Sequence, residues 1–209
     1  MQKIYLEYPE LTEIPANIVS RKMSTDSTQI ILDRTIFMPG SSYLLKDTGS
    51  ISDMEIISID EKRDNIIHLV KGRPEKSEVI LSLDMATRMR NLSYNTAYII
   101  FKMIMSSFYI YQDIDLELTY DKARLVVNEF YDEFDAGLIE EQINFLIEKS
   151  LRISNWQGIT SISPLGEVVN NEISFDNTSK VRGFKILSHE FKGNNLHIEI
   201  KAGSDILNL

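Results

Sequence analysis

Short runs of alternating apolar and polar residues fill the first eighty or so positions of the chain. A period of two is the pattern of strands that bury one face. Polar and turn-forming residues separate the runs, with Asp60-Glu61-Lys62-Arg63-Asp64 suited to a hairpin loop and Gly72-Arg73-Pro74 ending the next run. We expect a small barrel-like β domain with strands over Lys3–Glu7, Gln29–Phe37, Glu55–Ile59, Asn65–Val70 and Glu78–Leu83.

Near residue 84 the hydrophobic period changes from two to about 3.6, which is the period of an α-helix. Asp84 is suited to cap the amino terminus of this helix. The residues that recur at helical spacing are Met85, Met89, Leu92, Thr96, Ile99 and Met103. A second helix is expected over Ala136–Arg152, where an apolar stripe lies beside Glu140, Glu141 and Glu148.

The rest of the chain adds strands to these helices. Strand-like runs are Asp115–Tyr120, Ala123–Asn128, Gly183–Leu187 and Leu196–Lys201, and Lys192-Gly193-Asn194-Asn195 forms the turn between the last two. The pattern predicts an α+β protein. A mainly β, barrel-like domain is expected over residues 1–83, followed by an α/β two-layer domain over residues 84–209.

Composition narrows the possible chemistry. Hydrophobic residues make up 43% and charged residues 25%, as in a packed globular protein. No apolar run approaches the roughly 20 residues of a membrane span, so we expect a cytoplasmic protein without a membrane partner. The chain has no cysteine and three histidines, which excludes thiolate metal sites and cysteine nucleophiles. His68 is expected to be an ordinary strand residue, whereas His189 and His197 flank a turn and could approach each other.

The net charge of −9 comes from one segment. Residues 113–148 hold eleven acidic and two basic residues, and the remainder has twenty of each sign. Acidic chains bind nucleic-acid phosphates poorly, and we expect no DNA partner. A local basic face could form around Lys180, Arg182, Lys185 and Lys192, although a solvated surface is the commoner use of scattered basic residues.

Three motifs occur in a fixed order. Leu32-Asp33-Arg34-Thr35-Ile36-Phe37-Met38-Pro39-Gly40 is followed by Asp47-Thr48-Gly49, then by Arg88, Leu92 and Asn95-Thr96-Ala97-Tyr98-Ile99, and finally by the segment Asn177–Leu187. Together they resemble AlaX-type alanyl-tRNA editing proteins, which are similar to the editing domains of alanyl- and threonyl-tRNA synthetases. The resemblance extends over nearly the whole chain.

The resemblance implies a zinc-dependent hydrolase that cleaves the ester between a wrong amino acid and tRNA. In that family, two histidines one helical turn apart and a Cys/His pair hold the zinc. The corresponding positions here are Asn95, Ile99, Asn170 and Ser174, so the zinc cofactor expected of the family lacks its ligands and we expect none. Where the family has glycines in the first motif, this chain has Ser41, Ser42 and Tyr43.

Two functions therefore stay open. The chain is either a trans-acting editing homologue that contacts the tRNA acceptor end, or a non-catalytic module that binds tRNA, a small molecule or a protein partner. Hydrolysis without metal would require a polar pocket lined by Tyr94, Asn95, Thr96, Tyr98, Asn170 and Ser174, with Ser41–Tyr43 at its rim. Neither motif supplies a general base, so the catalytic residues are unknown.

Overall fold

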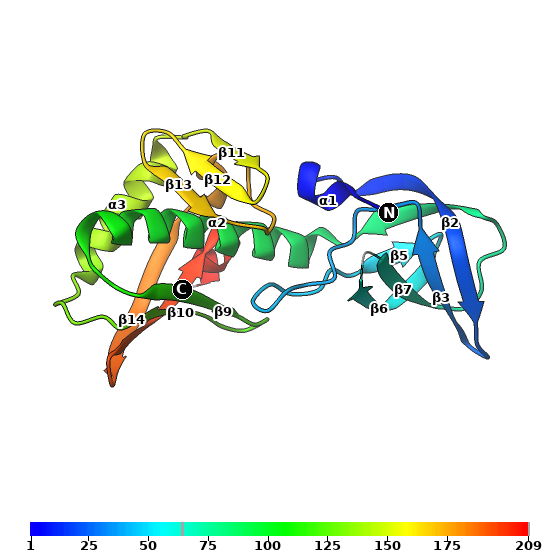
Figure 1. Ribbon diagram of the computed structural model, residues 1–209, viewed down its shortest axis with the longest axis horizontal. Coiled ribbons are helices and arrows are strands. Elements are labelled where there is room, and N and C mark those ends of the chain that lie inside the picture. The colour runs from blue at the N-terminus through cyan, green and yellow to red at the C-terminus, as the bar shows by residue number, and fades with distance from the viewer. Residues whose placement is uncertain (64, 209) are drawn as a thin grey trace. The chain divides into compact units, whose positions relative to one another are not determined.

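A computed structural model describes residues 1–63 and 65–208 of the chain. The structure divides into two compact units, Met1–Met89 and the remainder from Arg90 onward, and both are drawn in Figure 1. Helix α2 (Met85–Phe108) begins in the first unit and continues in the second. The domain boundary predicted between residues 83 and 84 stays a prediction.

The first unit is built around a closed antiparallel barrel with strand order β2-β3-β7-β6-β5-β8. Its strands are β2 (Glu13–Met23), β3 (Ser27–Leu32), β5 (Gly49–Ile51), β6 (Met54–Lys62), β7 (Asn65–Lys71) and β8 (Glu78–Leu83). Outside the barrel, β1 (Gln2–Lys3) pairs in parallel with β4 (Arg34–Thr35), and α1 (Ile4–Glu7) follows β1. The predicted barrel-like architecture is confirmed.

Alternation explains why these segments form a barrel. Along β7 the side chains of Ile66, His68 and Val70 point inward and are fully buried, while their neighbours are exposed or half-buried. Gly49 lets β5 approach β8 closely, because a Cβ at this position would lie 2.3 Å from the carbonyl oxygen of Ser82. The barrel closes through this contact.

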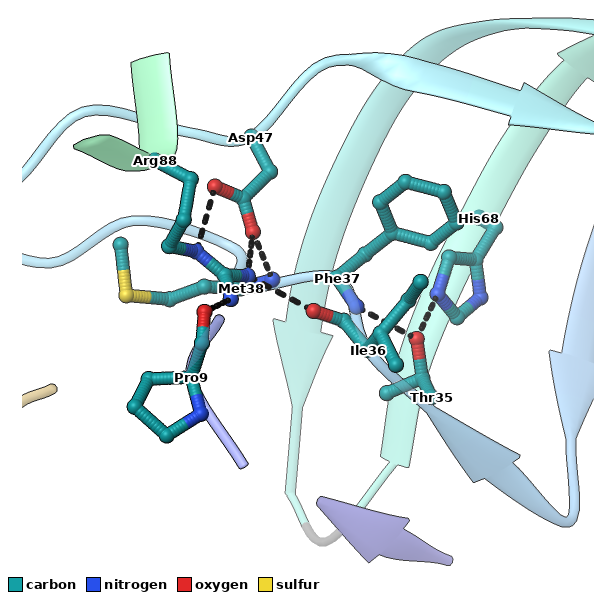
Figure 2. A network of polar contacts seen from close by, with 8 residues as sticks. All are labelled: Pro9, Thr35, Ile36, Phe37, Met38, Asp47, His68 and Arg88. Atoms are coloured by element: carbon teal, nitrogen blue, oxygen red, sulfur yellow. Dashed lines mark hydrogen bonds and ion pairs between the residues drawn. The ribbon is translucent and has the colours of Figure 1, made fainter. Parts of the chain in front are cut away.

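A buried ion pair fixes the loop between β4 and β5 to the start of α2 (Figure 2). The Arg88 guanidinium donates to both carboxylate oxygens of Asp47 and to the backbone carbonyls of Pro9 and Ile36. The backbone N–H of Met38 donates to the same carboxylate at 2.6 Å. Burial raises the pKa of the Asp47 carboxyl, and the contacts with Arg88 and Met38 oppose that rise.

His68 lies inside the barrel and contacts Thr35 (Figure 2). Its Nε2 is 2.9 Å from the Thr35 hydroxyl, whose oxygen also accepts from the backbone N–H of Phe37 at 3.1 Å. The hydroxyl can donate its proton to Nε2, an arrangement that suits the neutral ring. Burial lowers the pKa of His68 from 6.5 to about 4.

The second unit contains two antiparallel sheets. The larger sheet has strand order β14-β15-β10-β9, with β9 (Asp113–Leu118), β10 (Ala123–Asn128), β14 (Phe184–Lys192) and β15 (Asn195–Ala202). The smaller sheet joins β11 (Ile153–Trp156), β12 (Ile159–Ile162) and β13 (Gly166–Val169). Helix α3 (Ala136–Glu148) and the 3-10 helices η1 (Thr178–Val181) and η2 (Gly203–Asn208) complete the unit. The fold is thus of the predicted α+β class.

Helix α2 contacts the larger sheet and the segment that follows β13. Tyr98 donates to the carbonyl of Ile114 on β9, and the Phe101 ring lies 6.3 Å from that of Phe184 at the start of β14. Asn95 and Thr96 contact the segment that follows β13. The predicted N-cap is confirmed, because Asp84 accepts from the N–H of Ala86 at 3.0 Å.

Several predicted elements need correction. Lys3–Glu7 is not a strand, because α1 occupies Ile4–Glu7. The expected run Gln29–Phe37 is broken at Asp33, whose carboxylate accepts from the N–H of Asn17. Helix α3 ends at Glu148 and not at Arg152, since Ser150 has a left-handed φ of 54°.

One turn lies where the pattern predicts it, whereas the loop predicted from Asp60 is shorter, because Asp60, Glu61 and Lys62 belong to strand β6. Lys192 pairs with Asn195, and Gly193 has a φ of +62°. Lys62 pairs with Asn65 in the other hairpin, although Asp64 of that predicted turn lies outside the described residues.

Strand β9 lies at the edge of the larger sheet. Its outward positions are Asp113, Asp115 and Glu117, whereas Ile114, Leu116 and Leu118 are buried. Asn128 of β10 donates to both Asp113 and Asp115. In the described part of the chain, no helix combines the length and hydropathy that a bilayer span needs.

Removing the Asp47 carboxylate should strongly destabilise the first unit, because it leaves the Arg88 charge buried without its partner. For Asp47→Ala we expect a loss of about 3–5 kcal/mol in the free energy of unfolding, measured by urea denaturation. Asp60→Ala serves as control, since Asp60 pairs with Lys46 at an exposed position. That pair should contribute no more than about 1 kcal/mol. Equal losses in the two variants would show that burial of the pair is unimportant.

The stability of the barrel should fall as the pH drops below 6.5, because His68 takes up a proton in the unfolded chain at a higher pH than in the barrel. Because its folded-state pKa is lowered, the contribution of the neutral ring is fully present above pH 6.5 and is lost as the pH falls towards about 4. The shift corresponds to about 3 kcal/mol. His68→Gln should abolish this part of the pH dependence, measured as the difference between the variant and the wild type in urea denaturation from pH 7 to pH 4. Parallel pH profiles of the two proteins would contradict the assignment.

Candidate functional site

Asn95, Thr96 and Ile99 are buried on α2, with exposed fractions of 0%, 0% and 1%. Residues three and four apart share a helix face, so Asn95 and Ile99 lie one above the other. Asn95 Nδ2 donates to Asn170 Oδ1 at 3.2 Å and to the carbonyl of Ile173 at 2.8 Å. The structure thus brings together two of the four positions that the sequence resemblance matches to the family's zinc ligands, a match that stays a prediction.

Asn170 follows β13 and links α2 to the smaller sheet. Its Nδ2 donates to the Thr160 hydroxyl and to the carbonyl of Glu172, each at 3.0 Å. The Thr160 hydroxyl in turn donates to Asn155 Oδ1 at 2.5 Å. Asn155 Nδ2 donates to the Ser174 hydroxyl at 2.9 Å, so Ser174 joins the same chain of hydrogen bonds. We call Asn95, Asn155, Thr160, Asn170 and Ser174 the amide network.

Asn155 and Thr160 of this network were not expected from the sequence. They face each other as a cross-strand pair on β11 and β12, which lie outside all three motifs. Thr160 is fully buried, and Asn170 and Ser174 are 9% and 2% exposed. Asn95 Oδ1 is buried and accepts no hydrogen bond from the described residues.

The third motif ties the network segment to α3. The Asn177 side chain caps η1 by accepting from the N–H of Ser179 at 2.8 Å, and the Thr178 hydroxyl donates to the carbonyl of Leu146 at 2.7 Å. Thr96 Oγ1 accepts from the N–H of Phe175 at 2.9 Å. Hydrogen bonds therefore hold residues 170–178 against α2 through Thr96 and against α3 through Leu146.

Tyr94 and Tyr98 point away from the amide network. The Tyr94 hydroxyl donates to Asp205 at 2.8 Å, beside the Arg90–Asp205 ion pair. The Tyr98 hydroxyl donates to the carbonyl of Ile114. Burial, together with the nearby charges of Asp115 and Asp113, raises the pKa of Tyr98 to about 12. The structure therefore does not bring these phenols to Asn170.

Ser41, Ser42 and Tyr43 belong to the first unit, in the loop between β4 and β5. The Ser41 hydroxyl accepts from the N–H groups of Tyr43 and Leu44, at 3.4 and 3.1 Å. Ser41 lines a cavity of about 590 Å³ with Pro39, Gly40, Lys46, Ile59, Asp60, Glu61 and Lys62. The predicted role of these three residues at a pocket rim stays a prediction.

The residues at the four family positions do not fit zinc. Ile99 has no donor atom, and neutral amide and hydroxyl oxygens are weak ligands for zinc. The Asn170 side chain and the Ser174 hydroxyl also take part in hydrogen bonds with protein groups. Among residues 1–63 and 65–208, no group of three or more His, Cys, Asp or Glu side chains could hold a metal.

His189 and His197 cannot form a shared site. His189 pairs with Ile198, and His197 pairs with Glu190, so neighbouring positions of the hairpin place the two rings on opposite faces. The His189 ring contacts Phe134 at a centroid distance of 5.2 Å.

Three lysines of the suggested basic face form ion pairs with carboxylates. Lys180 pairs with Asp176, Lys185 with Glu140 and Lys192 with Glu190. These pairs weaken the case for a phosphate-binding face here.

No protein-family model matches the chain. A curated protein that it resembles is the alanyl-tRNA editing protein AlaX-L of Pyrococcus horikoshii, which is 32% identical over 136 residues. The match covers 61% of this chain, and the chain spans about a third, 34%, of the length of that relative. The resemblance to this kind of protein is thereby confirmed over 61% of the chain and not over nearly its whole length, and the chain is a distant homologue of an AlaX-type alanyl-tRNA editing protein.

Proposed function

We propose that this protein is a trans-acting relative of the aminoacyl-tRNA editing proteins that has no zinc-dependent deacylase activity. The observation that supports this proposal is the amide network, which contains three of the four residues that the resemblance matches to the family's zinc ligands. Zinc catalysis requires imidazole or thiolate ligands and one open coordination position. Imidazole and thiolate groups are both absent from the four matched positions, which hold Asn95, Ile99, Asn170 and Ser174.

The network also lacks an acid or base for hydrolysis without metal. Asparagine, threonine and serine side chains do not ionise near neutral pH, and a serine or threonine nucleophile needs a neighbouring base. His68 is in the first unit, where Thr35 holds its ring inside the barrel. The function that remains is binding, with the acceptor end of tRNA as the ligand that homology suggests. A tRNA ligand agrees with the cytoplasmic location expected from the sequence.

A second candidate is a non-catalytic module for a partner other than tRNA. The acidic balance of the chain and the paired lysines favour it, because tRNA binding depends on free cationic groups. Affinity for tRNA therefore separates the two candidates.

Deacylation of tRNA charged with Ser, Gly or Ala should proceed at the spontaneous rate, with or without added zinc. Loss of the metal and of any general base should leave catalysis at least about 10²-fold below that of AlaX-L measured beside it. Binding is measured separately, by fluorescence anisotropy with charged tRNA and with the same tRNA truncated at its 3′ end. Zinc-stimulated deacylation would refute the proposal. Equal affinities for the two tRNAs, or no binding, would favour the second candidate.

Restoring the four ligands should create a zinc site if the four positions converge. We expect the variant Asn95→His/Ile99→His/Asn170→Cys/Ser174→His to bind one zinc per chain, measured by elemental analysis and by the absorption of its cobalt form. The control is Asn95→His/Asn170→Cys, whose two ligands are too few for a stable site. A quadruple variant that folds but carries no zinc would show that the positions do not converge.

A further inference from the structure

The amide network joins parts of the second unit that are far apart in sequence. Asn95 and Asn170 are 75 positions apart, and their side chains meet in the interior. Its members belong to different elements, with Asn95 on α2, Asn155 on β11 and Thr160 on β12. The network therefore connects the helix to the smaller sheet and to the segment after β13.

A metal ion bound at the same four positions would make the same connection. Two ligands on α2 and two on the segment after β13 would join the helix to that segment through coordination bonds. Metal binding of this kind contributes directly to folding free energy. Because this chain has lost the ligands and keeps the connection, something else must hold the two parts together.

We propose that the amide network replaces the metal as the structural connection between α2 and the segment after β13, and extends that connection to the smaller sheet, so that the second unit folds without any metal. The network is suited to this task because most of its polar groups are paired with other protein groups, and a buried group that is paired does not incur the desolvation cost of an orphan. Ile99 adds apolar packing at the one position without a hydrogen-bonding group. This inference concerns folding and does not depend on the proposed function.

The Thr160 hydroxyl is the best point to test the network, because it accepts from Asn170 and donates to Asn155. Thr160→Val keeps the shape of the side chain. It removes one hydrogen-bond acceptor from Asn170 Nδ2 and the hydrogen-bond donor from Asn155 Oδ1. Ser161→Ala is the matched control, since Ser161 is the next residue on β12 and faces the opposite side of the sheet. Thr160→Ser keeps the hydroxyl and should retain more stability than Thr160→Val.

Thermal unfolding is followed with and without a chelator. We expect Thr160→Val to lower the midpoint by about 5 °C or more, and Ser161→Ala to change it by less than about 1 °C. Neither the chelator nor added zinc should shift the wild-type midpoint. If Thr160→Val does not fold, hydrogen exchange of the wild type provides the measurement. The Phe175 N–H, which donates to Thr96, should be protected equally with and without chelator. A midpoint lowered by the chelator, or equal effects of Thr160→Val and Ser161→Ala, would overturn the inference.

Discussion

Arg88 carries a positive charge into the interior of the first unit, and a buried charge must be met by acceptors at fixed positions. The acceptors here come from three parts of the chain: Asp47, the Ile36 carbonyl and the Pro9 carbonyl. The pair therefore joins the loop after β4 to the first turn of α2. The motif residues Ile36, Met38 and Asp47 therefore have a structural role at this ion pair that does not depend on catalysis.

The alternation of apolar residues made much of the barrel predictable. Strands β8 and β10 are recovered residue for residue, because every second side chain in them is apolar and faces a core. Strand β2 was missed because most of its side chains are exposed and because it contains Pro15, a residue that is uncommon within strands. The strands β11–β13 are four residues each, too short to show a period, and Gln157-Gly158 and Pro164 separate them.

The candidate site was predictable only as far as the motifs reached. Spacing placed Asn95 and Ile99 on one helix face, and the resemblance placed Asn170 opposite them, where it contacts Asn95. Asn155 and Thr160 carry no motif and gave no signal, since their role depends on a cross-strand pairing that sequence spacing alone does not specify. The orientations of Tyr94 and Tyr98 were likewise decided by tertiary partners, Asp205 and the Ile114 carbonyl.

The carboxylates on the edge strand β9 affect how copies of this protein meet in solution. An edge strand offers unpaired backbone groups to any other strand, and this one is otherwise a regular alternating strand. Two molecules approaching along β9 would bring Asp113, Asp115 and Glu117 of one against the same residues of the other. That repulsion opposes growth of a continuous sheet between molecules, and it strengthens as salt is removed. Charge on this strand thus opposes edge-to-edge pairing of two molecules through β9.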